Sequence, residues 1–207
     1  MARTRRLAGS EPDNQLFRRR ALGALTTEIG VYALCDLDET PIYVGQSVDG
    51  IRARVNRHLT SARSDIIANR QIDVWEIAYV KAWPVNNVAQ IARLEAILYR
   101  MFDHQKRLVN GSIPQLIGTM PAGVPPPAQT IQVMADEDIR IRRDPALRLP
   151  RQIEHIGRLV DHILNVKDSP QLRQALAAHF DRLGAYRDAF LQQGAPVIRA
   201  AGRTEDE

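Results

Sequence analysis

The pattern of apolar and polar positions is clearest between residues 28 and 110 of the 207-residue chain. Two short apolar runs, at residues 28–34 and 41–45, are separated by a polar segment of aspartate, glutamate and threonine. Apolar runs on either side of a turn-prone segment are typical of an antiparallel hairpin. A third run, at residues 72–83, alternates and is rich in branched and aromatic side chains, which predicts a third strand.

Two segments have apolar residues at helical spacing, one directly after the hairpin and one directly after the third strand. Apolar residues recur every three or four positions in both places, which predicts helices over residues 51–63 and 88–102: Ile51, Val55 and Leu59 in the first, and Ile91, Leu94, Leu98 and Met101 in the second. The pattern therefore predicts an α/β fold, with a small three-stranded antiparallel sheet flanked by helices.

The rest of the chain divides by composition. Residues 1–27 form a predicted basic arm. Residues 111–128 are rich in proline and glycine, which predicts a linker or a loop that packs over the first domain. Residues 129–193 form a mainly helical C-terminal unit, with a short strand at 130–134 and helices at 151–166 and 170–192. The two helices have one apolar side, which must pack against the first domain or against another chain. Residues 194–207 form a predicted tail, and we expect its end, residues 203–207, to be disordered.

Charge and cysteine content narrow the function classes. Lysine and arginine total 28 against 24 acidic residues, giving a net charge of +4 that favours a polyanionic partner. Cys35 is the single cysteine, so neither an intrachain disulfide nor a cysteine-based zinc site can form, and a reducing cytoplasm is the expected compartment. No apolar run approaches the roughly 20 residues of a membrane span, so we expect no membrane partner.

Five residues carry candidate chemistry. Tyr32 and Tyr43 lie in the two strands of the hairpin, and Glu95 lies at the border of the apolar stripe of its helix. Arg54 and His58 are four residues apart in a helical pattern, so both project from one helix face. Phenols, a guanidinium, an imidazole and a carboxylate are the groups that a metal-assisted phosphodiester hydrolase uses.

The same residues give the chain its resemblance to a known family. The hairpin contains the tripeptides Gly30-Val31-Tyr32 and Tyr43-Val44-Gly45, and these are followed in order by Arg54 with His58, by Glu95 and by Asn110. In this order and at this spacing, residues 28–110 resemble the GIY-YIG nucleases. The chain departs from many members of that family at Gln46, where they have a lysine.

The resemblance implies a role for each matching residue. Glu95 would hold a divalent metal, for which magnesium is expected and manganese is the alternative, since such hard cations prefer oxygen ligands. Tyr32 and Tyr43 would serve as general base and partner, in an order that the sequence leaves open, and Arg54 would contact the scissile phosphate. His58 or Arg54 would assist proton removal from a tyrosine. We also assign contacts with nucleic acid to Gly45, Gln46, Arg52, Arg57 and Asn110.

The resulting hypothesis is a magnesium-dependent DNA endonuclease, of a restriction or defence type that would act as a homodimer through its C-terminal helices. One alternative is a structure-specific or single-strand nuclease of repair or recombination, acting as a monomer. Another alternative is a nucleic-acid-binding module without catalytic activity. Because the hairpin loop is short, recognition would fall to the C-terminal unit or the basic arm.

Overall fold

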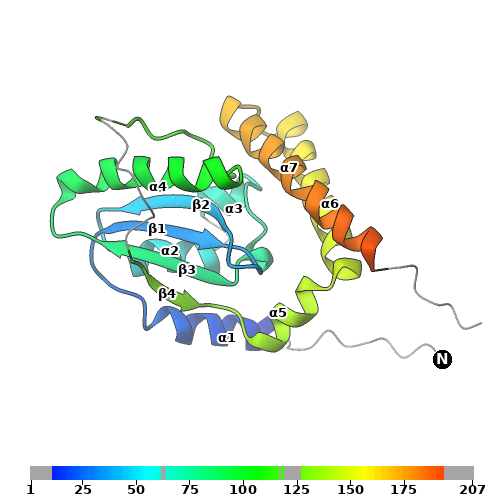
Figure 1. The fold of residues 1–207 in the computed structure, drawn as a ribbon, viewed down its shortest axis with the longest axis horizontal. Helices are drawn as coiled ribbons and strands as arrows, with labels where there is room; N and C mark the ends of the chain where they lie inside the picture. The colour runs from blue at the N-terminus through cyan, green and yellow to red at the C-terminus, as the bar shows by residue number, and fades with distance from the viewer. Residues whose placement is uncertain (1–10, 62–63, 117, 119–126, 194–207) are drawn as a thin grey trace, which may run out of the picture.

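The computed structural model describes residues 11–61, 64–116, 118 and 127–193. The predicted tail, the first ten residues of the predicted arm and much of the predicted linker lie outside these described residues. Within them, a four-stranded antiparallel sheet is covered by helices, and a long helical hairpin lies at one end of it (Figure 1). The predicted α/β class with a helical C-terminal part is confirmed.

The sheet has the strand order β2-β1-β3-β4. The strands are β1 (Gly30–Cys35), β2 (Pro41–Ser47), β3 (Tyr79–Pro84) and β4 (Gln129–Gln132), and all neighbours are antiparallel. Three of these strands were predicted for the sheet, and β4 adds a fourth after the proline-rich segment. The third strand is shorter than predicted, because part of residues 72–83 forms the 3₁₀ turn η1 (Val74–Glu76).

The turn of the β1–β2 hairpin is held by one aspartate. Asp36 is buried, and its carboxylate oxygen Oδ1 accepts hydrogen bonds from the backbone N–H groups of Asp38 and Thr40, each at 3.0 Å. Glu39 adopts a positive φ of 60° within this turn. An aspartate that bonds the following backbone is a common way to stabilise a tight turn, and this turn fixes the register in which Tyr32 faces Gly45.

Helices cover both faces of the sheet. On one face, Tyr32 and Leu34 pack with Ile51 and Val55 of α2 (Ile51–Thr60). On the opposite face, strand residues such as Val31 pack against α4 (Ile91–Gln105), which follows the 3₁₀ turn η2 (Val88–Gln90). The alternation of side chains along β1 thus sends Tyr32 to the α2 face and its neighbours to the α4 face.

The N-terminal helix α1 (Glu11–Leu22) belongs to the folded body. Its Arg18 is only 2% exposed and donates hydrogen bonds to the carbonyl groups of Val74, Ile77 and Val133. Figure 1 shows α1 beside β4. This helix therefore supports the sheet, and the part of the predicted arm that the structure describes is a packed element.

The C-terminal part consists of α5 (Asp136–Arg143), α6 (Pro145–Asn165) and α7 (Pro170–Gln192). The predicted cap of the last helix is present, since the Ser169 hydroxyl accepts from the Leu172 N–H. Ion pairs attach α6 to the loops at the end of the sheet: Arg148 bonds the buried Glu76 of η1 at 2.5 Å and the partly exposed Asp38 of the β1–β2 turn at 2.5 Å. None of the helices formed by the described residues is long and apolar enough to cross a membrane.

Candidate active site

Three aromatic rings meet on the α2 face of the sheet. The ring centroids of Tyr32 and Tyr43 are 6.3 Å apart, and the His58 ring lies 6.0 Å from that of Tyr32 and 6.1 Å from that of Tyr43. The two tyrosines come from neighbouring strands, and His58 comes from the last turn of α2. The hairpin and the helix thus bring together three residues that the sequence predicted to be catalytic.

Gly45 makes room for the first tyrosine. It is the cross-strand partner of Tyr32, and a Cβ at this position would lie 2.5 Å from the Tyr32 hydroxyl oxygen and 2.8 Å from the Tyr43 ring. Only a residue without a side chain allows this close approach. The predicted role of Gly45 in nucleic-acid contact is not tested, but its contact with both rings explains why glycine is needed there.

His58 is held in a neutral state inside the protein. Its Nδ1 lies 2.7 Å from the hydroxyl oxygen of Ser64, while its Nε2 is buried without a hydrogen-bond partner among the described residues. Burial, together with the positive charge of Arg54, lowers the pKa of His58 to about 4. At neutral pH the imidazole is therefore uncharged and has one ring nitrogen that can donate to or accept from a ligand, depending on the tautomer.

Arg54 is the cation nearest the two phenols. Its side chain is one-third exposed, and its guanidinium lies 4.0 Å from the carboxylate of Asp65. Burial raises the pKa of Tyr43 to about 12 and that of Tyr32 well above 10, while Arg54 acts in the opposite direction on both. The geometry between Arg54 and Tyr32 falls short of a hydrogen bond, since the Tyr32 hydroxyl and Arg54 Nε both lack a partner among the described residues.

Glu95 approaches from the other side of the sheet. Helix α4 packs mainly against the edge strand β2, and the negative charge of Glu95 contributes to the raised pKa of Tyr43. Glu95 is half-buried, and loss of hydration raises its own pKa from 4.5 to about 7. The described residues give it neither an ion pair nor a hydrogen bond, so the carboxylate is available to a cation.

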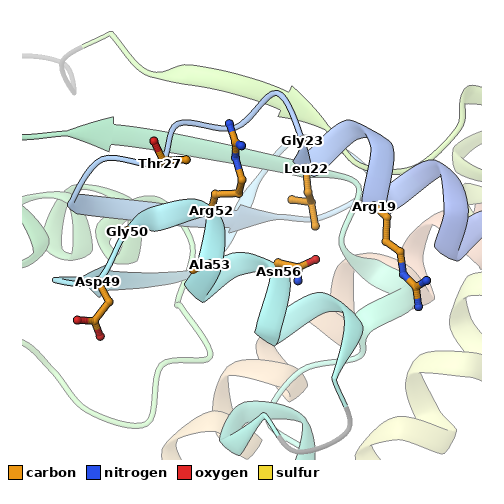
Figure 2. Close-up of a pocket in the computed structure, with 9 residues that line it drawn as sticks. All are labelled: Arg19, Leu22, Gly23, Thr27, Asp49, Gly50, Arg52, Ala53 and Asn56. Carbon is orange, nitrogen blue, oxygen red and sulfur yellow. The ribbon is translucent and has the colours of Figure 1, made fainter.

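The other predicted nucleic-acid contacts lie in different surroundings. Gln46 and Arg57 are exposed, and the strand partner of Gln46 is Val31, which packs on the α4 face. Arg52 donates from Nε to the Leu25 carbonyl at 2.6 Å. Its side chain lines a cavity of about 340 Å³ between α1 and the start of α2, and it points to the loop after α1 (Figure 2).

The side-chain amide of Asn110 pairs with the backbone of β2. Its Oδ1 accepts from the Val44 N–H at 2.9 Å, and its Nδ2 donates to the Val44 carbonyl at 2.5 Å. This pairing satisfies the outer edge of β2 in the way that another strand would. Asn110 is therefore buried beside Tyr43, with both ends of its amide engaged.

Sequence reasoning missed two residues of the site. Ser64 fixes the ring of His58, and Asp65 pairs with Arg54 and contributes to the raised pKa of both tyrosines. The sequence of residues 64–71 predicts only a polar connection that contains a short turn of helix, so neither residue was assigned to the site. The one available signal was serine followed by aspartate before the apolar pair Ile66-Ile67, which is a typical helix start and marks α3 (Asp65–Ala68).

The arrangement can bind and hydrolyse a phosphodiester. It combines a guanidinium for a phosphate, a neutral imidazole and two phenols for proton movement, and a free carboxylate for a divalent cation. Among the described residues, no group of three or more histidine, cysteine, aspartate or glutamate side chains could hold a metal. A divalent metal bound here would therefore take most of its ligands from water or from the substrate.

Residues 28–107 match the family model described as the GIY-YIG catalytic domain. The matched segment contains Tyr32, Tyr43, Arg54, His58 and Glu95, and it ends before Asn110 and the C-terminal helices. Neither the comparison with curated proteins nor the comparison with solved structures gave a match. The match confirms the resemblance for residues 28–107, and it indicates that this segment is a nuclease domain, whose substrate is a nucleic acid.

Proposed function

Residues 28–107 form a GIY-YIG catalytic domain, and from this premise we propose that the protein is a magnesium-dependent DNA endonuclease. The observation that carries the proposal is the meeting of the Tyr32, Tyr43 and His58 rings within 6.0–6.3 Å of one another. Arg54 and Glu95 both influence the pKa of Tyr43, which Arg54 lowers and Glu95 raises. We propose that these groups, from the hairpin, α2 and α4, serve the same scissile phosphate, as cleavage of a phosphodiester requires.

Arg54 is the proposed phosphate ligand. Its guanidinium can donate two parallel hydrogen bonds to phosphate oxygens and neutralise the charge that develops on them. Asp65, at 4.0 Å, orients it. Because Asp65 is exposed and Arg54 is one-third exposed, this ion pair is weak enough to yield to a phosphate.

The tyrosines and His58 are proposed to handle the proton of the attacking water. Both phenols have a raised pKa, so they are protonated at neutral pH and can orient a water by donating hydrogen bonds. His58, with a pKa of about 4, is uncharged and can accept a proton at Nε2 when Nδ1 carries the hydrogen that faces Ser64. We therefore assign proton acceptance to His58 and positioning of the water to Tyr32 and Tyr43.

Glu95 fits the divalent metal that the family implies. The carboxylate is half-buried and has no partner among the described residues. Its loss of hydration raises its pKa and so disfavours the charged form. A bound cation would lower that pKa again. Bound there, Mg²⁺ would stabilise negative charge on the phosphate and on the leaving oxygen. Mn²⁺ has similar ligand preferences and is the expected substitute.

Two kinds of endonuclease fit this site. A restriction or defence enzyme must cut both strands and would work as a dimer, a reading supported by exposed apolar residues on α6 and α7, namely Ile153, Leu164, Phe180 and Phe190. A structure-specific or single-strand nuclease would work as a monomer. Light scattering of the purified protein with and without duplex DNA separates the two, because only the first requires a dimer.

The experiment that tests the proposal is incubation of the purified protein with plasmid, single-stranded and branched DNA. Each substrate is tried in EDTA, Mg²⁺ and Mn²⁺, beside Glu95→Ala and the control Glu154→Ala, which removes an exposed carboxylate on α6. We expect cleavage that requires metal and Glu95 but not Glu154. Binding of DNA without metal-dependent cleavage would instead support a non-catalytic binding module.

A further inference from the structure

A second cavity lies directly beside Tyr43. Its volume is about 270 Å³, and it is bounded by the end of α3, the segment at residues 110–112 and the start of α7. It therefore joins the catalytic domain to the C-terminal helices, which the family match does not include. Because Tyr43 lines it, whatever occupies this cavity lies next to the proposed scissile phosphate.

One glutamine that lines this cavity has a side-chain amide free to bond a ligand. Gln71 as a residue is only 8% exposed, and its side chain makes no hydrogen bond to any described residue. Its amide atoms are not among the buried unpaired atoms of the described residues, so the amide reaches solvent, and a ligand in the cavity could take the place of water there. The neighbouring amides of Asn69 and Gln171, which also line the cavity, likewise make no side-chain hydrogen bond to a described residue.

The backbone holds Gln71 firmly in this position. The end of α3 forms two C-terminal capping bonds, from the Gln71 N–H to the Ile66 carbonyl and from the Arg70 N–H to the Ile67 carbonyl. Arg70 adopts the left-handed conformation, with φ of 57°, that this cap needs. In addition, His179 of α7 lies 2.8 Å from the Gln71 carbonyl oxygen. The amide is thus presented by a rigid turn.

Gly111 lets the surrounding elements come close. A Cβ on Gly111 would lie 2.6 Å from Nε2 of Gln71 and 2.8 Å from Cβ of Gln171. Ile66 and Leu172, both buried, add apolar surface to the lining. The cavity therefore offers apolar surface together with hydrogen-bonding amide edges, which is the combination that binds an unstacked nucleobase.

Charge argues against a phosphate inside the cavity. Asp65 lines it and would repel a phosphate, whereas a carboxylate accepts hydrogen bonds from exocyclic amino groups of bases. Lys167, the one cation in the described lining, is exposed at the cavity and can meet a phosphate outside it. The volume is also below the roughly 300–1,000 Å³ typical of pockets for drug-sized ligands, which suits a single base.

We propose that this cavity receives one unstacked nucleobase, from the nucleotide next to the scissile phosphate. The inference rests on the proposed nuclease function and assigns substrate selection to Asn69, Gln71 and Gln171. A base enters such a cavity only after leaving its stack, which costs least where the base is unpaired. The enzyme therefore prefers DNA with an unpaired base at the cut site.

The test uses a series of oligonucleotides in which a single abasic site is moved along the cleaved strand. Single-turnover cleavage and binding, the latter measured by fluorescence anisotropy in EDTA, are followed for wild type, Gln71→Leu and the control Gln105→Leu. Gln105 is an exposed glutamine at the end of α4 with no side-chain hydrogen bond to a described residue. We expect wild type and Gln105→Leu to lose about tenfold in binding or cleavage at one abasic position, which corresponds to about 1.4 kcal/mol.

The Gln71→Leu variant should bind and cleave intact DNA about tenfold less well and lose its sensitivity to that abasic position. Gly111→Ala, which crowds the Gln71 amide, should behave in the same way, and thermal unfolding shows whether each variant is folded. If Gln71→Leu is unfolded, the sensitivity of Gly111→Ala to the abasic position decides whether the cavity binds a base.

The outcomes separate this inference from the proposed function. Position-specific loss of binding without any cleavage would refute the nuclease activity and retain the base-binding cavity. Two results would refute base binding in the cavity and retain the nuclease activity. One is cleavage at the same rate whatever the position of the abasic site. The other is the same loss at an abasic site in Gln71→Leu as in Gln105→Leu.

Discussion

The carboxylate of Glu95 should destabilise the folded protein at neutral and alkaline pH. Burial raises its pKa from 4.5 to about 7, so the protonated form is favoured in the folded state. The resulting contribution to stability is fully present below about pH 4.5 and is lost as the pH rises through about 7. Replacing Glu95 with glutamine, which is neutral at every pH, should therefore stabilise the protein at about pH 8.

The size of the effect follows from the two pKa values. Each pH unit between them corresponds to about 1.4 kcal/mol, which sets an upper limit of about 3 kcal/mol. The side chain is only half-buried, so solvent screening reduces the gain to about 1–2 kcal/mol. At about pH 4.5, where most of the Glu95 population is protonated in the folded protein, the difference should fall below about 0.5 kcal/mol.

Urea unfolding in EDTA at both pH values measures this difference. The control is Glu154→Gln, because Glu154 is exposed and has only a surface pair with Arg158. Adding Mg²⁺ at about pH 8 should then stabilise wild type and leave Glu95→Gln unchanged, because a ligand stabilises only the form that binds it. The reasoning is refuted if Glu95→Gln shows no gain at about pH 8, or shows the same gain at both pH values.

Three further results are expected. Cleavage should fall about tenfold per pH unit below about pH 7, as Glu95 becomes protonated, and more Mg²⁺ should move the midpoint to lower pH; a flat profile would contradict this assignment. Gly45→Ala places a Cβ 2.5 Å from the Tyr32 hydroxyl and should lower the single-turnover rate about 100-fold; a rate within about twofold of wild type would exclude the close approach. Arg148→Met removes a partner of Glu76, which is 3% exposed, and should cost about 3 kcal/mol in urea unfolding; a loss below about 1 kcal/mol would show that Arg148 contributes little to stability.

Local patterns were enough to predict the core of the site. Two apolar runs around a polar turn determine a hairpin, and a spacing of four determines one helix face, so Tyr32, Tyr43, Arg54 and His58 could be assigned to their elements. These assignments depend on neighbours in the sequence. The structure adds the ring contacts among Tyr32, Tyr43 and His58.

The features that were missed depend on distant contacts. Arg18 looks like any solvated arginine in sequence, yet it caps carbonyl groups up to 115 residues away. Asn110 pairs with Val44 across 66 residues. The strand predicted at residues 130–134 was assigned to a separate unit, but the strand found at residues 129–132 pairs with β3. Periodicity contains no information about which distant backbone groups need a partner.

The most direct test of the central claim is the single-turnover cleavage rate of Tyr32→Phe against that of Tyr79→Phe. Both changes remove only a hydroxyl group from a strand tyrosine, but Tyr32 packs with Tyr43 and His58, whereas Tyr79 lies on β3 outside the ring cluster. The proposed site predicts that Tyr32→Phe loses at least about 100-fold in rate while remaining folded, and that Tyr79→Phe cleaves at the wild-type rate. Equal rates for the two variants would contradict it.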